Sequence, residues 1–111
     1  MNIQHFEKGV QYNDQELLIL AKKLGKLATY CKSVKDESSF IRVEAERRQT
    51  KKQRDQVKVA IMVELPRKTF RAESRRVDVI EAVDRVVEKL EPQLKRHKEM
   101  MMGRARARRR G

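Results

Sequence analysis

The sequence predicts an α+β fold of order β-α-β-β-β-α, in which a four-stranded sheet has two helices packed on one face. Apolar residues recur at three- and four-residue spacing in segments 13–34 and 79–99, which indicates two amphipathic helices. Apolar and polar residues alternate in segments 38–45 and 56–65, which indicates strands with one buried face. Two helices on one sheet face would bury these apolar surfaces in a single core and leave the other sheet face polar.

The first helix follows a short opening strand in residues 1–10. Asn13 and Glu16 have the spacing of a capping box, in which each side chain bonds a free backbone N–H, so we expect the helix to begin there. Its buried stripe is predicted at Leu17, Leu20, Ala21, Leu24, Leu27, Ala28 and Cys31. Gly25 costs the helix about 1 kcal/mol relative to alanine. This glycine fits either close packing on the sheet or close approach of an RNA backbone.

The other three strands are predicted in the middle of the chain. Segments 38–45 and 56–65 are separated by a charged stretch, residues 46–56, which has neither an apolar period nor a compact turn signal. We expect a long, solvated loop there. Residues 65–68 then turn the chain into a short fourth strand, residues 69–74.

The closing helix contains a proline at a position that opposes helix formation. Its apolar stripe is predicted at Val79, Val83, Val86, Val87, Leu90 and Leu94. Pro92 lacks the N–H that would bond the carbonyl of Glu88, a defect of about 3 kcal/mol in a helix interior. We predict a kink, or a break with a second helix starting at Pro92, without a dedicated function.

The chain is predicted to form one domain and a tail. Residues 1–99 contain all the predicted elements, and 111 residues leave no room for a second domain. Residues 100–111 have five arginines near their end and few core-forming residues, so we expect a flexible, basic tail. A nonspecific electrostatic anchor is favoured over a disordered remnant.

The charge of the chain indicates a polyanionic partner. There are 28 Lys and Arg against 16 Asp and Glu, a formal net charge of +12. Nucleic acid is favoured over a membrane, because no segment has the broad aromatic and leucine face of an interfacial helix. No apolar run is long enough to span a bilayer, and the first ten residues lack the apolar core of a signal peptide, so we expect a cytoplasmic protein.

The sequence lacks the patterns of an enzyme. His5 and His97 are far apart and have no metal-ligand spacing, Cys31 lies on an apolar stripe, and there is no glycine-rich phosphate loop. We expect no catalytic residue, metal site, cofactor or small-molecule substrate. The aromatic residues, three Phe and two Tyr without Trp, are too few for a base-stacking platform, so RNA contacts are expected at phosphate and ribose.

Two segments resemble the ribosome hibernation promoting factor family, also called ribosome-associated inhibitors or sigma-54 modulation proteins. They are "AKKLGKLATY" in the first helix and "FRAESRRVDVIEAVDRVVEKLEPQLKRHK" at the end, and the order of elements agrees over residues 1–99. The most specific part is an acidic residue followed by "AVD" and then "KLEPQL" with basic residues after it. The length is similar to that of the short members, which lack a dimerising domain, so we expect a monomer.

The resemblance implies that residues 1–99 bind the small ribosomal subunit through its rRNA, in the decoding cleft. Occupancy would block the tRNA and mRNA sites, inhibit translation and preserve idle ribosomes under stress and in stationary phase. The family's rRNA-contacting positions correspond here to Lys23, Lys26, Lys89 and Arg96, and we add the neighbouring cations Lys22, Arg85, Lys95 and Lys98. One position departs, because relatives commonly have an arginine where this chain has Pro92.

Two other functions are consistent with the same basic helices. One is a protein-interaction regulator of the sigma-54 modulation type, whose basic face meets an acidic protein. The other is a general double-stranded RNA-binding protein, since a sheet backed by two helices also serves that purpose. Displacement by an acidic partner, by free duplex RNA, or by neither would distinguish these functions from a site shaped by the whole subunit.

Overall fold

The computed structural model describes the backbone of residues 1–48 and 56–110, and the side chains of residues 1–48 and 56–103. The elements in chain order are β1 (Asn2–Lys8), α1 (Asp14–Tyr30), a 3-10 helix η1 (Lys32–Lys35), β2 (Phe40–Arg47), β3 (Val57–Leu65), β4 (Lys68–Arg76) and α2 (Val79–Arg110). The predicted order β-α-β-β-β-α is confirmed. Most of the predicted charged loop, residues 49–55, lies outside the described residues.

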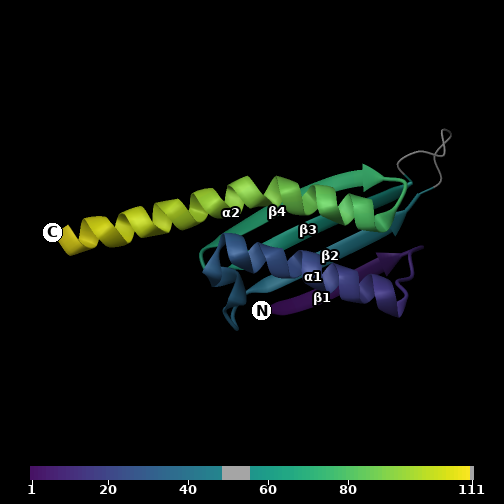
Figure 1. The fold of residues 1–111 in the computed structure, drawn as a ribbon, viewed down its shortest axis with the longest axis horizontal. Coiled ribbons are helices and arrows are strands. Elements are labelled where there is room, and N and C mark those ends of the chain that lie inside the picture. The colour runs from purple at the N-terminus through teal and green to yellow at the C-terminus, as the bar shows by residue number, and fades with distance from the viewer. Residues whose placement is uncertain (49–55, 111) are drawn as a thin grey trace.

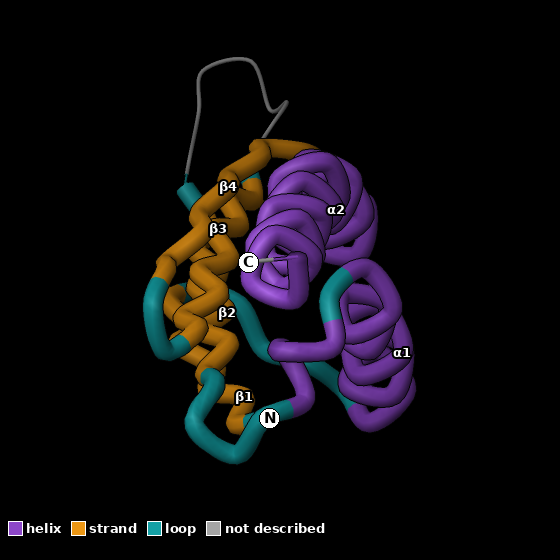
Figure 2. The backbone as a smooth tube through the Cα atoms, turned by 90° about the vertical axis from the view of Figure 1, so that its left-hand side faces the viewer, coloured by secondary structure: helices purple, strands orange, loops and turns teal. Residues whose placement is uncertain are grey.

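The four strands form one mixed sheet in the order β1-β2-β3-β4. β1 pairs in parallel with β2, and the other two pairs are antiparallel. A parallel pair needs a crossover, and α1 supplies it between β1 and β2. Both helices cover the same face of the sheet, with α2 over β3 and β4 and α1 beside β1 and β2 (Figure 1, Figure 2).

The core lies between this sheet face and the two helices. One row across the sheet consists of Ile3, Ile41, Val63 and Phe70, and all but the partly buried Ile3 are almost inaccessible. From α2, the six predicted core residues Val79, Val83, Val86, Val87, Leu90 and Leu94 are all buried. The period-two and helical patterns therefore identified the strand and α2 contributions to the core.

α1 begins as predicted, but its buried stripe includes fewer residues than expected. Both bonds of the capping box are present: Glu16 N–H donates to Asn13 Oδ1 at 2.7 Å, and Asn13 N–H donates to Glu16 Oε1 at 3.2 Å. The predicted burial of Leu17 and Ala21 is wrong, because Leu17 is 40% exposed and Ala21 is also exposed. Because Ala21 lies between Leu20 and Leu24, which are both fully buried, helical spacing identified the side of α1 that faces the core but overestimated the width of the buried stripe.

α2 continues through Pro92 without ending, so the predicted alternative of a break is wrong. It also continues to Arg110, so no change of secondary structure marks the expected domain boundary at residue 99, and the flexibility of residues 100–111 stays a prediction. Met, Ala and Arg, which dominate this segment, all have high helix propensity. In the part of the chain that is described, neither α2 nor α1 is long and apolar enough to cross a membrane.

The open face of the sheet is less polar than predicted. Phe6 is 49% exposed and Phe40 is 41% exposed, and both belong to the set of strand positions that points away from the helices. The guanidinium of Arg42 lies 5.2 Å from the centroid of the Phe6 ring, which gives the ring a cation–π contact. The open face therefore combines charged residues with two accessible rings.

Candidate nucleic-acid interface

The predicted RNA-binding cations lie on both helices, and most of those of α2 lie on two sides of its exposed line. The outermost line of α2 runs through Glu81, Arg85, Glu88 and Pro92, at helical spacing and all exposed. Two of these four are acidic, and Arg85 donates to Glu88 Oε2 at 2.9 Å. The remaining predicted cations of α2 lie on either side of this line, on two flanks of the helix.

The first flank is the side of α2 that faces α1. Lys23 of α1 forms an ion pair with Asp84 of α2, and the Lys23 side chain is only 18% exposed. Lys26 follows Lys23 by one turn of α1, and its side chain is exposed. Further along, the Lys95 ammonium lies 5.5 Å from the centroid of the Tyr30 ring. Lys23 and Tyr30 are thus the α1 residues that contact α2 on this flank.

Some cations of this flank are already paired with a carboxylate of the protein, and others are not. Lys95 donates to Glu91 Oε1 at 2.8 Å, and this hydrogen bond raises the pKa of Lys95. By contrast, Lys22, Lys26 and Lys98 make no ion pair with any carboxylate of the described residues. Lys98 also lines a groove of about 390 Å³ with Lys32, at the junction of α1 and η1. Lys32 is a neighbouring cation that the sequence analysis did not include.

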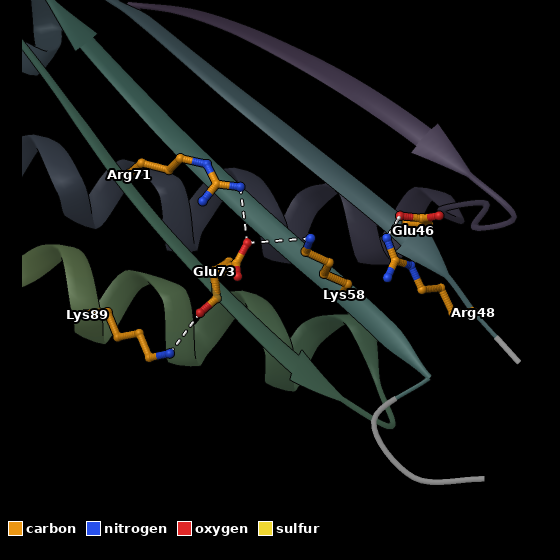
Figure 3. A network of polar contacts seen from close by, with 6 residues as sticks. All are labelled: Glu46, Arg48, Lys58, Arg71, Glu73 and Lys89. Carbon is orange, nitrogen blue, oxygen red and sulfur yellow. Dashed lines mark hydrogen bonds and ion pairs between the residues drawn. The ribbon is translucent and has the colours of Figure 1, made fainter. Parts of the chain in front are cut away.

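The second flank is the side of α2 that faces β4. Lys89 Nζ donates to the backbone oxygen of Glu73 at 2.8 Å, which ties α2 to the outer edge of the sheet (Figure 3). The carboxylate of Glu73 accepts from Arg71 at 3.1 Å and lies 3.5 Å from the ammonium of Lys58 (Figure 3). The hydrogen bond from Arg71 and the charge of Lys58 lower the pKa of Glu73. Lys89 therefore has a structural contact in addition to its predicted role.

Arg96 belongs to the same flank and is available to a ligand. It follows Lys89 by two turns, its side chain is exposed, and no carboxylate of the described residues pairs with it. It borders a groove of about 400 Å³ that also includes Lys68, at the start of β4. Sequence spacing could not bring Lys68 and Arg96 together, because one is on a strand and the other on a helix.

The eight predicted site residues thus fall into two sets. Lys23, Arg85, Lys89 and Lys95 have intramolecular partners that neutralise or hold them. Lys22, Lys26, Arg96 and Lys98 have no carboxylate partner among residues 1–48 and 56–103. These four, which we call the unpaired cations, are the ones best able to neutralise phosphate. Within the same residues, no group of three or more His, Cys, Asp or Glu side chains could hold a metal ion.

Comparison with known proteins identifies the family. The sequence profile of the family described as sigma 54 modulation protein / S30EA ribosomal protein matches residues 10–102. A search of curated proteins gives no match.

Two solved structures have a similar fold. The Thermus thermophilus Protein Y N-terminal domain is 28% identical with a TM-score of 0.68, and the alignment covers 87% of this chain and 99% of that one. A ribosomal subunit interface protein from Coxiella burnetii is 28% identical with a TM-score of 0.69, over 89% of this chain and 99% of that one. Because the family profile covers most of the chain, the protein belongs to the sigma 54 modulation protein / S30EA ribosomal protein family.

Proposed function

We propose that this protein binds the small ribosomal subunit through rRNA of the decoding cleft and inhibits translation by occupying the tRNA and mRNA sites. Membership of a family of ribosome-associated proteins supports a ribosome-associated function. A similar structure is described as a ribosomal subunit interface protein, and 99% of it aligns with this chain. Acting on idle ribosomes in the cytoplasm, such a protein would preserve subunits until translation resumes.

The observation that best supports RNA as the ligand is the set of unpaired cations. A solvated helix face usually balances its charges, as Arg85 with Glu88 and Lys95 with Glu91 do here. Lys22, Lys26, Arg96 and Lys98 have no such balance among the described residues. Their charges are available to release counterions from RNA phosphates, which is the main source of affinity in nonspecific and shape-based recognition.

The proposed mechanism is steric occlusion and needs no chemical step. The sheet and its buried core hold α1 and α2 in a fixed relation, and the Lys23–Asp84 ion pair and the Lys89–Glu73 hydrogen bond add links at the surface. The helices therefore present their cations without reorganising on binding, which lowers the entropic cost of association. A rigid body in the cleft would exclude tRNA and mRNA by volume.

Charge reversal of two unpaired cations tests this proposal. Lys26→Glu with Lys98→Glu changes one exposed residue on each helix, and neither contributes to the core. We expect the fold to survive, as judged by far-ultraviolet circular dichroism. Affinity for purified small subunits should fall on the order of 100-fold, because two charged contacts become repulsive.

A matched control makes the same change in net charge on the opposite side of the protein. Lys8→Glu with Arg75→Glu alters two exposed residues of one cross-strand row on the open sheet face. If both double variants lose affinity equally, net charge alone drives binding and the helix site is wrong.

Displacement of the wild-type protein by free duplex RNA, or by an acidic protein, would instead indicate one of the two rival functions.

A further inference from the structure

A groove between β4 and α2 has the composition of a phosphate site. It is bounded by residues 68–70 at the start of β4 and by Gln93, Arg96, His97 and Met100 of α2, with a volume of about 400 Å³. Its lining includes two cations, an amide and an imidazole, and no carboxylate. Phosphate oxygens accept hydrogen bonds from these groups, and Arg and Lys add charge.

The charges in this groove have no carboxylate partner in the described part of the chain. None of the ion pairs there includes Lys68 or Arg96. A groove on the open sheet face provides a contrast, because its cations Lys8 and Lys58 share the lining with Glu7, Glu44 and Glu46. The β4–α2 groove is therefore selective for an anion by composition, whereas the open-face groove is mixed.

Packing holds the walls of the groove in place. The Phe70 ring is buried and meets the His97 ring edge-on, with the centroids 5.3 Å apart. The Lys68 ammonium lies 5.5 Å from the centroid of the same Phe70 ring. Gln93 Nε2 donates to the backbone oxygen of Lys89 at 3.2 Å. A strand and a helix thus position the donors before a ligand arrives, which favours binding.

The same packing decides which part of a nucleotide the groove accepts. A base would need an exposed aromatic face on which to stack. Phe70 is 4% exposed and its ring is already covered by Lys68 and His97, so it offers no such face. A phosphate and its ribose need only charge and hydrogen-bond donors, which the groove supplies.

We propose that the β4–α2 groove binds a backbone phosphate of the RNA contacted by α2, with Lys68 and Arg96 as the charged ligands. The inference rests on the proposed function, since the phosphate is assigned to rRNA of the small subunit. It extends the RNA-binding surface from the helices to the β3–β4 turn. Arg96 belongs to both the helix surface and the groove, because it lies on the β4 flank of α2 and also lines the groove.

Lys68→Glu tests the groove, and Arg67→Glu is its matched control. The two residues are adjacent and exposed, but only Lys68 lines the groove. We expect Lys68→Glu to lower small-subunit affinity on the order of tenfold more than Arg67→Glu. Lys68→Gln should also reduce the slope of log affinity against log salt by about one, as expected for loss of one phosphate contact. Equal effects of the two charge reversals would overturn the proposal.

A second measurement separates the groove from the ribosomal function. The wild-type protein and Lys68→Glu are titrated with inorganic phosphate while backbone amide shifts are followed by NMR. If the wild type does not bind subunits, the proposed function fails, and the phosphate titration alone then decides about the groove. Shifts at Thr69, Gln93 and His97 that Lys68→Glu abolishes would support the β4–α2 groove as an anion site. Absence of those shifts would overturn it.

Discussion

Lys23 shows how a contact in the fold changes the interpretation of a predicted site residue. The family resemblance predicts it as an rRNA contact, yet its side chain is mostly covered and forms an ion pair with Asp84 of α2. The two residues are 61 positions apart, so no sequence spacing could indicate the pair. We infer that Lys23 contributes mainly to the α1–α2 contact, while the exposed Lys26 is the better candidate for an RNA phosphate.

Gly25 in α1 is explained by neither packing nor a turn. A Cβ atom placed there would meet no atom within 4 Å, which removes close packing on the sheet as the reason for this glycine. Gly25→Ala should therefore raise the free energy of unfolding by about 0.5–1 kcal/mol through helix propensity. Urea denaturation would measure the change.

The same variant addresses close approach of RNA at this position. If an RNA backbone lies against Gly25, the added methyl group will lower small-subunit affinity although stability rises. Unchanged affinity would show that RNA does not approach there. A fall in stability would contradict the open space that the structure shows at this position.

Tyr12 is the residue whose ionisation should report the native fold. Burial raises the pKa of its phenol from 10.0 to about 12, and Glu7 and Glu16 add to the shift. Because the folded pKa is raised, the associated stability is complete below pH 10 and is lost as the pH rises toward about 12. In a Tyr30→Phe background, the tyrosinate absorbance of Tyr12 should appear at a higher pH in the native protein than in the urea-unfolded protein. Ionisation at the same pH in native and urea-unfolded protein would contradict this.

At the level of elements, local patterns predicted the starts and faces of the helices and strands well. The capping box at Asn13 begins α1, and the alternation of apolar residues places Ile41, Val43 and Ala45 in the core. These signals are local, since each depends on residues within one turn or one strand. Burial of Leu17 was predicted wrongly because it depends on where the opposing layer ends, which is a property of the tertiary structure.

α2 is continuous through Pro92, so the proline should weaken the helix without dividing it. Pro92 is exposed on the outer line of α2, and a substitution there would not disturb the core. Pro92→Ala restores an N–H opposite the carbonyl of Glu88 and should raise the free energy of unfolding by about 1–3 kcal/mol. Chemical denaturation would test this.

Pro92→Arg distinguishes the stability of α2 from its part in binding. It should stabilise α2 to a similar extent and also supply the cation that the family resemblance leads us to expect at this position. Small-subunit affinity should increase for Pro92→Arg and stay unchanged for Pro92→Ala. Equal affinity of the two variants would show that position 92 does not face RNA.

For the whole molecule, the sequence predicted a basic protein but not how its charges are distributed. The net charge of +12 indicated a polyanion, and family resemblance indicated which helices bind it. Which cations are unpaired depends on contacts between distant segments, such as Lys89 with Glu73 and Lys68 beside Arg96. The structure therefore shows which of the predicted cations are already paired within the protein and on which side of α2 each one lies.

This charge distribution predicts that the affinity for the small subunit falls as the salt concentration rises. Each phosphate neutralised contributes about −0.7 to −0.9 to the slope of log affinity against log salt. The four unpaired cations alone then predict a slope of about −2.8 to −3.6. Additional contacts from the β4–α2 groove would make the slope steeper still.

The most direct test of the central claim is sedimentation of the purified protein with small ribosomal subunits across a salt series, with tRNA as competitor. We expect binding that weakens steeply with salt and that excludes tRNA, because the protein and tRNA would occupy the same cleft. No binding to the subunit, binding that is indifferent to tRNA, or binding that is insensitive to salt would contradict occlusion of the decoding cleft through phosphate contacts.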